Sequence, residues 1–347
     1  MKNKFLGIAL IIGLFSLSSC SINLLAEDKG EVTTSIKEVT TDDYTVPSPE
    51  IEGDYTVTYM CNNGFTYISK TTGLNKVLKP DDPTKLCATF LGWYSDQACT
   101  QVFDFTKIVH EDTYVYAKWD IDLVSLVNTV STKSIKSNVR IWITNYDKTG
   151  FGPMATMQNA STSLGSGVIF YESAGFYYAL TNNHVVYTTT TYQTLTLEDA
   201  YETKYEFDIV AKDAKYDLAL IRFRKGEELE VASVANYSVS KDEIVFAMGE
   251  PNGLSNTISM GYILGSKVFS PETSTIEMSN VTFSVYLNSA PIDSGSSGGA
   301  LLDSNLRLVG VNFASAVDPS TGNFKYSYTI PIDRVREFIK TYTTLNI

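Results

Sequence analysis

The chain has 347 residues, of which 44% are hydrophobic and 19% are charged, a composition typical of globular proteins and a length that favours two domains. Acidic residues outnumber basic ones by 39 to 27, and the resulting net charge of −12 argues against nucleic acid as a partner, because phosphate binding needs a basic surface. The sequence has only two histidines and no Cys-x-x-Cys spacing, so we expect neither a metal nor another cofactor.

Residues 1–19 have the pattern of an export signal. Lys2 and Lys4 precede an apolar run over residues 5–17, which is short for a membrane-spanning helix. The run ends in Leu-Ser-Ser-Cys, which resembles the lipobox of bacterial lipoproteins and implies lipidation of Cys20. The alternative is a plain secretory signal with a cysteine at the cleavage point. The resemblance implies a lipid anchor in the cell membrane, with the protein on the extracytoplasmic face.

Residues 20–52 are rich in Thr, Ser, Glu, Asp and Pro and contain few large apolar side chains. Such a segment cannot bury enough apolar surface to order itself, so we expect a disordered tether. Beyond Cys20 the chain has three cysteines, Cys61, Cys87 and Cys99. An odd number cannot all pair within one chain, and the sequence leaves open whether any disulfide forms.

Residues 53–120 form a segment of their own. YTVTYMCNNGFTYIS alternates around an Asn-Asn-Gly turn, which predicts a β-hairpin. Together with ATFLGWYSD, QVFDFTKI and EDTYVYAKWD, it resembles the Listeria/Bacteroides-type surface repeat, also called the internalin B-repeat. The resemblance implies a small β-grasp-like module, with a surface protein or a carbohydrate as its ligand. We expect His110, in the polar segment VHEDT, to be an exposed loop residue. The residues that carry the resemblance are Gly64, Pro80, Pro83, Phe90, Gly92, Trp93, Tyr94, Phe103, Asp104, Phe105, Tyr116, Ala117, Lys118 and Trp119.

Residues 121–347 read mainly as a series of short strands, each bounded by Gly, Asn, Asp or Pro. Alternation in NVRIWIT places Val139, Ile141 and Ile143 on one face, and GVIFYESAGFYYALTN reads as two strands around a Ser-Ala-Gly turn. Further strand-like segments are DLALIRF, EIVFAMG, TISMGYILG, FSVYLN and LRLVGVNFA. The pattern predicts a mainly-β fold, a sandwich or a barrel.

The C-terminal segment changes period. Val335, Phe338, Ile339 and Tyr342 fall at i, i+3, i+4 and i+7, and Asp333 stands before them as a candidate N-cap. This spacing predicts one amphipathic C-terminal helix.

The segment PIDSGSSGGALL raises the question of which of its three serines could be a nucleophile. Acyl transfer by serine needs a hydroxyl on a tight turn and backbone N–H groups for the oxyanion. Only Ser297 stands in the full frame Gly-x-Ser-Gly-Gly, where glycines allow close approach of the substrate. We therefore expect Ser297 to be the nucleophile, with the N–H groups of Gly295 and Ser297 as the oxyanion hole.

A base and a carboxylate occur in two earlier segments, His184 in YALTNNHVV and Asp217 in AKYDLALIRF. With GSGVIF and the Gly-x-Ser-Gly-Gly frame, these segments resemble trypsin-like serine proteases of the chymotrypsin fold, particularly the bacterial HtrA-like ones. The chain order His, Asp, Ser is also the order of that fold. Over about residues 122–345, the resemblance implies two six-stranded β-barrels with a C-terminal helix. It also implies a triad of His184, Asp217 and Ser297 that hydrolyses peptide bonds through an acyl-enzyme.

Three departures limit what the resemblance implies. Ser296 stands where chymotrypsin-type zymogens have an Asp, so activation by an inserted N-terminus is not expected. Too few residues follow Ser297 for the PDZ domain of HtrA proteins. Pro291 occupies the place of the pocket aspartate of trypsin, which disfavours cleavage after Lys or Arg. The expected substrates are proteins or peptides. The alternative function is a surface adhesin or binding lipoprotein in which the protease fold is an inactive scaffold.

Overall fold

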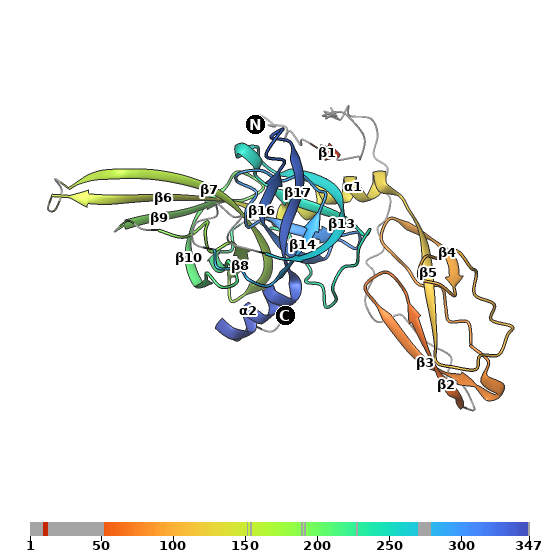
Figure 1. The fold of residues 1–347 in the computed structure, drawn as a ribbon. Helices are drawn as coiled ribbons and strands as arrows, with labels where there is room; N and C mark the ends of the chain where they lie inside the picture. The colour runs from red at the N-terminus through yellow and green to blue at the C-terminus, as the bar shows by residue number, and fades with distance from the viewer. Residues whose placement is uncertain are drawn as a thin grey trace, which may run out of the picture. The chain divides into compact units, whose positions relative to one another are not determined.

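The computed structural model describes residues 52–150, 152, 155–188, 190, 192–226, 228–269 and 279–345, together with strand β1 (Leu10–Ile12). Cys20, the tether up to residue 51, and the expected signal peptide apart from β1 lie outside the described residues. The chain divides into two compact units, one of residues 26–127 and one that joins residues 1–25 with residues 128–347. Figure 1 shows the elements of both units.

The smaller unit is a four-stranded sheet with the order β3-β2-β5-β4, in which β2 and β5 run parallel. Asn62 and Gly64 have positive φ in the turn between β2 and β3, which confirms the predicted hairpin. His110 is exposed in a loop, as expected. The strands are β2 (Glu52–Met60), β3 (Thr66–Thr72), β4 (Ala88–Tyr94) and β5 (Thr113–Ile121), with a 3-10 turn, η1 (Gly73–Asn75), after β3.

Aromatic side chains of the repeat motifs fill the core of this sheet. The rings of Tyr59 and Trp93 meet edge to face at 5.4 Å, and both are buried. Trp119 Nε1–H donates to the carbonyl of Cys61 at 2.8 Å. No disulfide joins Cys61, Cys87 and Cys99, the described cysteines, and burial raises the pKa of Cys61 to about 11. The sheet is therefore held together by packing rather than by disulfides.

The first barrel of the larger unit is closed in the order β10-β11-β8-β7-β6-β9. Val139, Ile141 and Ile143 of β6 all point into its core and are fully buried, as the alternation predicts. The turn between β7 and β8 contains Ala174 and Gly175, both with positive φ. The strands are β6 (Asn138–Thr149), β7 (Thr156–Ser173), β8 (Phe176–Thr181), β9 (Tyr192–Glu198), β10 (Lys204–Asp213) and β11 (Leu218–Arg224).

Strands β6 and β7 are much longer than the short strands expected from the sequence. They pair as far as Thr149 and Thr156 and project from the barrel as a ribbon (Figure 1). The outer part of β7 is polar and rich in Thr and Ser, so it lacks the apolar alternation by which a half-buried strand is recognised.

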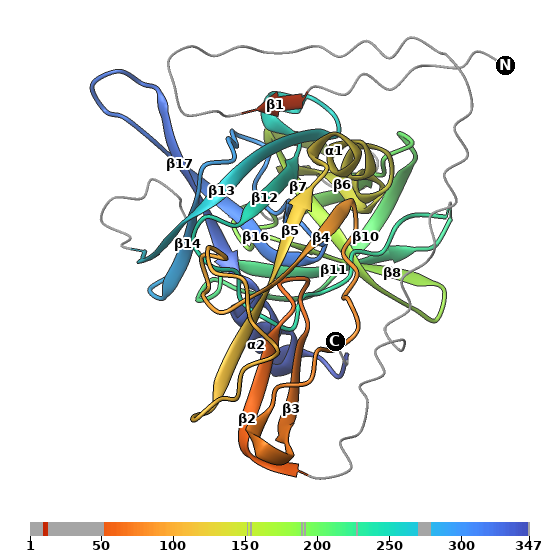
Figure 2. The same cartoon turned by 90° about the vertical axis from the view of Figure 1, so that its right-hand side faces the viewer.

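The second barrel contains six strands in the order β13-β12-β15-β16-β17-β14, and pairing of β13 with β14 closes the ring. Strand β1 adds to β13 in parallel. Figure 2 shows this barrel from another side. The strands are β12 (Ile244–Gly249), β13 (Thr257–Val268), β14 (Ser284–Asn288), β15 (Ala300–Asp303), β16 (Leu308–Val317) and β17 (Phe324–Pro331), with a 3-10 turn, η4 (Pro251–Gly253), after β12.

Two α-helices complete the described part of the chain. Helix α1 (Leu123–Thr132), followed by the 3-10 turn η2 (Ser134–Ser137), was not expected, because only strands were predicted after Trp119. Its apolar residues do have helical spacing, and Leu126 and Val130 are buried. Its valines and threonines favour strand, and this local preference obscured the period. Of the helices in the described residues, none has the length and apolarity needed to cross a membrane.

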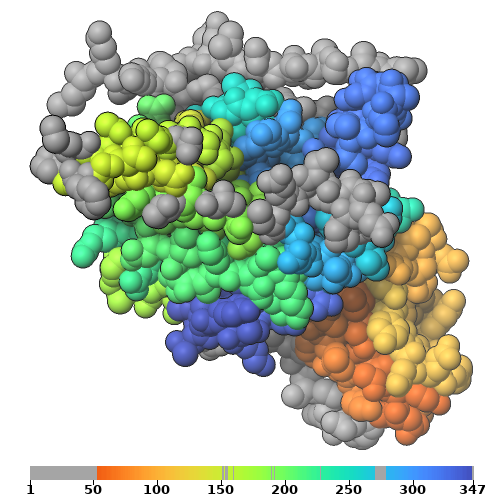
Figure 3. Space-filling model, turned by 60° about the vertical axis from the view of Figure 1, so that its left-hand side comes forward, coloured from red at the N-terminus to blue at the C-terminus, as the bar shows by residue number. Residues whose placement is uncertain are grey.

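Helix α2 (Ile332–Tyr342) is the predicted C-terminal helix. It buries Val335, Phe338 and Ile339, and Figure 3 shows it in dark blue against the green strands of the first barrel. Two details of the prediction are wrong. The N-cap is Pro331, so Asp333 lies in the first turn. Tyr342 is 45% exposed and donates its hydroxyl to Asp213. With two six-stranded barrels, this helix and the separate four-stranded sheet, the structure confirms the predicted fold class.

Replacing Phe338 with Ala tests how much α2 contributes to the larger unit. The side chain is fully buried and meets the ring of Tyr216 at 5.9 Å. We expect the free energy of unfolding to fall by about 3–5 kcal/mol, because the change removes a large aromatic ring and leaves a cavity. Calorimetry of the full chain measures the effect on the transition of this unit. The control is the exposed Lys340→Ala, for which we expect a change within about 0.5 kcal/mol; equal effects of the two variants would contradict the packing of α2.

Candidate active site

Strand pairing in the first barrel brings His184 and Asp217 together. His184 follows β8 by three residues, and Asp217 directly precedes β11. The two strands pair antiparallel with Thr181 opposite Ala219. The end of β8 therefore lies beside the start of β11, and the two side chains reach each other from adjacent loops.

Two hydrogen bonds join His184 to Asp217. The ring Nδ1–H of His184 donates to Oδ2 of Asp217 at 2.8 Å, and the backbone N–H of His184 donates to Oδ1 at 3.0 Å. Asp217 is fully buried, whereas the imidazole is 18% exposed. Asn182 Nδ2 donates to the carbonyl of Asp217 at 2.9 Å and fixes its backbone, which has φ of +51°. With Nδ1 protonated, the lone pair of His184 Nε2 is available to accept a proton.

Ser297 lies in the loop that leads into β15 of the second barrel. The carbonyl of Ser297 accepts a hydrogen bond from the N–H of Ser166 in β7 at 2.8 Å. The next residue, Gly298, has φ of +89°, and a Cβ there would come within 2.3 Å of Oγ1 of Thr181. Only glycine fits between the loop and the end of β8. The loop of Ser297 is therefore packed against the strand that leads to His184.

The hydroxyl of Ser297 donates to the carbonyl of Phe313 at 3.3 Å. In the part of the chain that the structure describes, no hydrogen bond joins this hydroxyl to His184. The other two serines of the loop differ in their surroundings. Ser296 is buried, and its Oγ accepts the N–H of Asp293 at 3.4 Å, whereas Ser294 is exposed. The structure thus brings His184 and Asp217 into contact. It leaves Ser297 partly exposed, in a loop that packs against the end of β8, the strand that leads to His184.

The expected oxyanion donors are the N–H groups of Gly295 and Ser297. Within the described ranges, neither N–H has a hydrogen-bond acceptor. The carbonyl of Ser294, which shares its peptide unit with the N–H of Gly295, accepts the N–H of Asn252 at 2.7 Å. Because C=O and N–H point in opposite directions in a trans peptide, this bond turns the Gly295 N–H away from the Asn252 turn. The two amides can therefore donate to an anionic oxygen.

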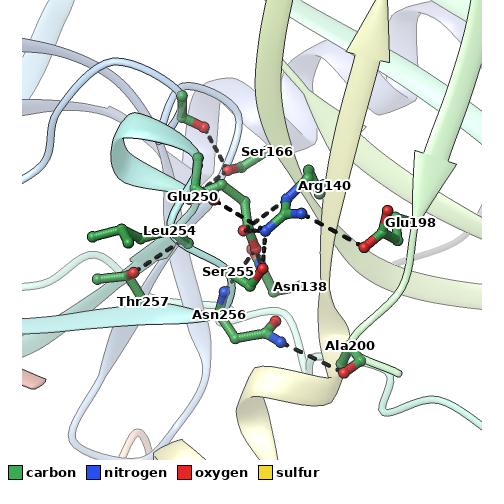
Figure 4. Close-up of polar contacts among 12 residues, drawn as sticks. Asn138, Arg140, Ser166, Glu198, Ala200, Glu250, Leu254, Ser255, Asn256 and Thr257 are labelled. Atoms are coloured by element: carbon green, nitrogen blue, oxygen red, sulfur yellow. Dashed lines mark hydrogen bonds and ion pairs between the residues drawn. The ribbon is translucent and has the colours of Figure 1, made fainter. Parts of the chain in front are cut away.

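A buried ion pair lies next to this loop, since a Cβ on Gly295 would come within 2.4 Å of the carbonyl oxygen of Glu250. Figure 4 shows the pair, Arg140 and Glu250, with its partners. Arg140 of β6 donates from Nε and Nη2 to Oε2 of Glu250 at 3.0 and 2.8 Å. Oε1 of Glu250 accepts Asn138 Nδ2 at 2.8 Å and the N–H of Asn256 at 2.9 Å. Arg140 also contacts Ser255 and lies 3.5 Å from Glu198. Burial raises the pKa of Glu250, although the N–H of Asn256 and the guanidinium of Arg140 oppose that rise.

None of these residues around Glu250 was singled out from the sequence. Arg140 stands on the opposite face of β6 from the apolar residues, where a charged side chain is ordinarily exposed, so the sequence pattern does not indicate its burial. Glu250 does carry a signal, since it is a carboxylate directly after the apolar strand IVFAMG. Among the described residues, no group of three or more His, Cys, Asp and Glu side chains is placed to hold a metal ion.

Comparison with known proteins finds similarity over two regions of the chain, one of which contains this site. Residues 165–311, which include His184, Asp217 and Ser297, match the trypsin-like peptidase domain. Residues 55–118 match the Listeria-Bacteroides repeat domain, which confirms that resemblance.

Curated relatives are similar over about half of this chain. A probable DegP-like periplasmic serine endoprotease of Buchnera aphidicola subsp. Baizongia pistaciae is 32% identical over 191 residues, 54% of this chain and 38% of the relative. The periplasmic serine endoprotease DegP of Escherichia coli is 32% identical over 184 residues, 52% of this chain and 35% of the relative. The Do-like serine protease HtrA of Bacillus subtilis is 35% identical over 162 residues, 45% of this chain and 34% of the relative.

The chain thus spans less than two fifths of the length of these relatives. The match to the trypsin-like peptidase domain covers residues 165–311, which contain most strands of the two barrels and the three expected triad residues. This part of the chain is therefore homologous to the trypsin-like serine peptidases of the HtrA type.

Proposed function

We propose that the two-barrel unit is a serine endopeptidase that hydrolyses peptide bonds with His184, Asp217 and Ser297. The observation that carries this proposal is the His184–Asp217 pair, in which a fully buried carboxylate orients an imidazole that is still open to solvent. Homology to HtrA-type serine peptidases supports the same activity. The substrates are proteins or peptides, and neither a metal nor a cofactor takes part.

The proposed reaction begins when the Ser297 hydroxyl leaves the Phe313 carbonyl and turns to Nε2 of His184. Oγ attacks the carbonyl carbon of the substrate while Nε2 accepts the proton, and Asp217 stabilises the imidazolium. The carbonyl oxygen becomes an oxyanion between the N–H groups of Gly295 and Ser297. His184 then returns the proton to the leaving amine, and water hydrolyses the acyl-enzyme by the reverse steps.

We further propose that the protein acts on the extracytoplasmic face of the cell membrane. Two of the relatives above are named periplasmic proteases, and the Leu-Ser-Ser-Cys pattern favours a lipid anchor at Cys20. Acyl chains on Cys20 would hold the peptidase at the membrane surface. The repeat domain, with a surface protein or a carbohydrate as its ligand, would bring the peptidase to its substrates.

Replacement of single serines in the loop tests the nucleophile. We expect Ser297→Ala to abolish labelling by a fluorophosphonate probe, because the probe forms its covalent bond with the nucleophilic oxygen. Ser296→Ala is the matched control and should be labelled like the wild type, since the Ser296 hydroxyl is buried against Asp293. Gel fluorescence of the purified proteins measures the outcome. A labelled Ser297→Ala would refute the assignment, and an unlabelled wild type would favour the inactive scaffold of a surface adhesin.

Replacement of the buried carboxylate tests the role of Asp217. We expect Asp217→Asn to lower the kcat for casein hydrolysis by about 10⁴-fold, because the amide cannot hold the tautomer in which His184 Nε2 accepts a proton. The control is Asp208→Asn, which removes an exposed carboxylate from the same barrel and should leave kcat unchanged. Similar activity of the two variants would show that Asp217 does not orient the base.

A further inference from the structure

The ion pair of Arg140 and Glu250 connects the two barrels beside the loop of Ser297. Arg140 belongs to β6 of the first barrel, and Glu250 directly follows β12 of the second. Their side chains are 13% and 2% exposed, so both charges are largely withdrawn from water. Neither belongs to the proposed triad or donates to the oxyanion. Any effect of these two residues on the reaction must therefore be indirect, through the backbone groups that they position.

The backbone of Glu250 is connected to the Gly295 carbonyl through one serine. The N–H of Glu250 donates to Oγ of Ser166 at 3.0 Å, and Oγ of Ser166 donates to the carbonyl of Gly295 at 2.7 Å. A Cβ on Gly295 would come within 2.4 Å of the Glu250 carbonyl, so the two backbones are in direct contact. Movement of Glu250 would therefore displace Gly295.

The turn after Glu250 also contacts the peptide unit on the N-terminal side of Gly295. The N–H of Asn252 donates to the carbonyl of Ser294 and thereby sets the direction of the Gly295 N–H. Asn252 has φ of +52°, and its Nδ2 donates to Asp293 at 2.9 Å. Oε1 of the Glu250 carboxylate accepts the N–H of Asn256, just beyond this turn. Oε2 accepts Nη2 of Arg140, which also donates to the carbonyl of Gly253 within the turn at 3.3 Å.

We propose that Arg140 and Glu250 are positioning residues for the oxyanion hole, which keep the turn of Asn252 in the place that directs the Gly295 N–H to the substrate. The inference rests on the proposed peptidase function and adds two residues to it. Packing alone would not require this arrangement, because replacing a buried ion pair by well-packed apolar residues is often neutral or stabilising. The hydrogen bonds of the Glu250 carboxylate are directional, so they hold the turn of Asn252 in a single position.

The experiment compares two covalent reactions of the full chain. Phosphonylation of Ser297 by a fluorophosphonate needs the oxyanion hole, whereas alkylation of His184 by iodoacetamide, after the thiols are blocked, does not. We expect Arg140→Met and Glu250→Gln each to slow phosphonylation by about 10- to 100-fold. This is less than the roughly 10²- to 10³-fold loss that follows removal of an oxyanion-hole donor, because the donor is displaced rather than removed. Mass spectrometry should show alkylation of His184 within about twofold of the wild type in the same variants.

Two further variants separate positioning from stability. Tyr237→Phe removes the partly buried hydrogen bond to Asp303 at the opposite end of β15, and we expect its phosphonylation rate to match the wild type. The double variant Arg140→Met/Glu250→Gln removes both charges; we expect it to unfold at a higher temperature than Arg140→Met and still to react slowly. Phosphonylation that recovers together with stability, or single variants that react like the wild type, would overturn the inference. A wild type that is not phosphonylated would overturn the peptidase function itself.

The ion pair also predicts a direction for the dependence of stability on pH. The charged and titratable groups that face Glu250 are Arg140 and, behind it, Glu198. Because burial raises the pKa of Glu250, the folded state holds its proton at a higher pH than the unfolded state. Relative to Glu250→Gln, the wild type should therefore lose free energy of unfolding as pH rises from the ordinary Glu range, with a slope of at most about 1.4 kcal/mol per pH unit. A difference that stays constant or grows with pH would contradict the raised pKa.

Discussion

The site depends on the hydrogen bonds through which Ser166 of the first barrel holds the loop of the second. The base and its carboxylate come from one barrel, whereas the serine and the amides come from the other. Their alignment is therefore a property of the contact between the barrels and not of either barrel alone. Ser166 is fully buried and bonds to the carbonyls of Gly295 and Ser297 at 2.7 and 2.8 Å. One residue thus positions both ends of the segment that carries the two expected oxyanion donors.

Most of the fold follows from local patterns in the sequence. Alternation identified many of the strands of the barrels, and paired Asn, Gly or Ser residues marked the hairpin turns. Helix α1 and the outer part of β7 were missed because the local pattern of their residues does not indicate the element that forms. The valines of α1 favour strand although their spacing is helical, and the polar end of β7 has no apolar face. In both places neighbouring chain segments decide the structure.

The residues of the site also differ in whether local sequence or long-range packing determines their place. The place of Ser297 could be read from the sequence because the glycines around it are required by the backbone itself, as the close contact of Gly298 with Thr181 shows. The meeting of His184 with Asp217 needed one further step, a resemblance that implied their place in one triad; in the structure it follows from the pairing of β8 with β11. Arg140 and Glu250 could not be paired in advance, because they are far apart in the sequence and meet only when the two barrels pack.

The energetic cost of burying the ion pair between the barrels helps to explain its role. Desolvation of two charges offsets much of their attraction, so the pair of Arg140 and Glu250 adds little net stability. An apolar pair could fill the same space without that cost, but it would allow the turn after β12 to adopt several conformations. The carboxylate of Glu250 instead accepts bonds from Asn138, Arg140 and Asn256. Because these bonds have fixed directions, the chain gives up free energy of unfolding for one defined geometry beside its reactive serine.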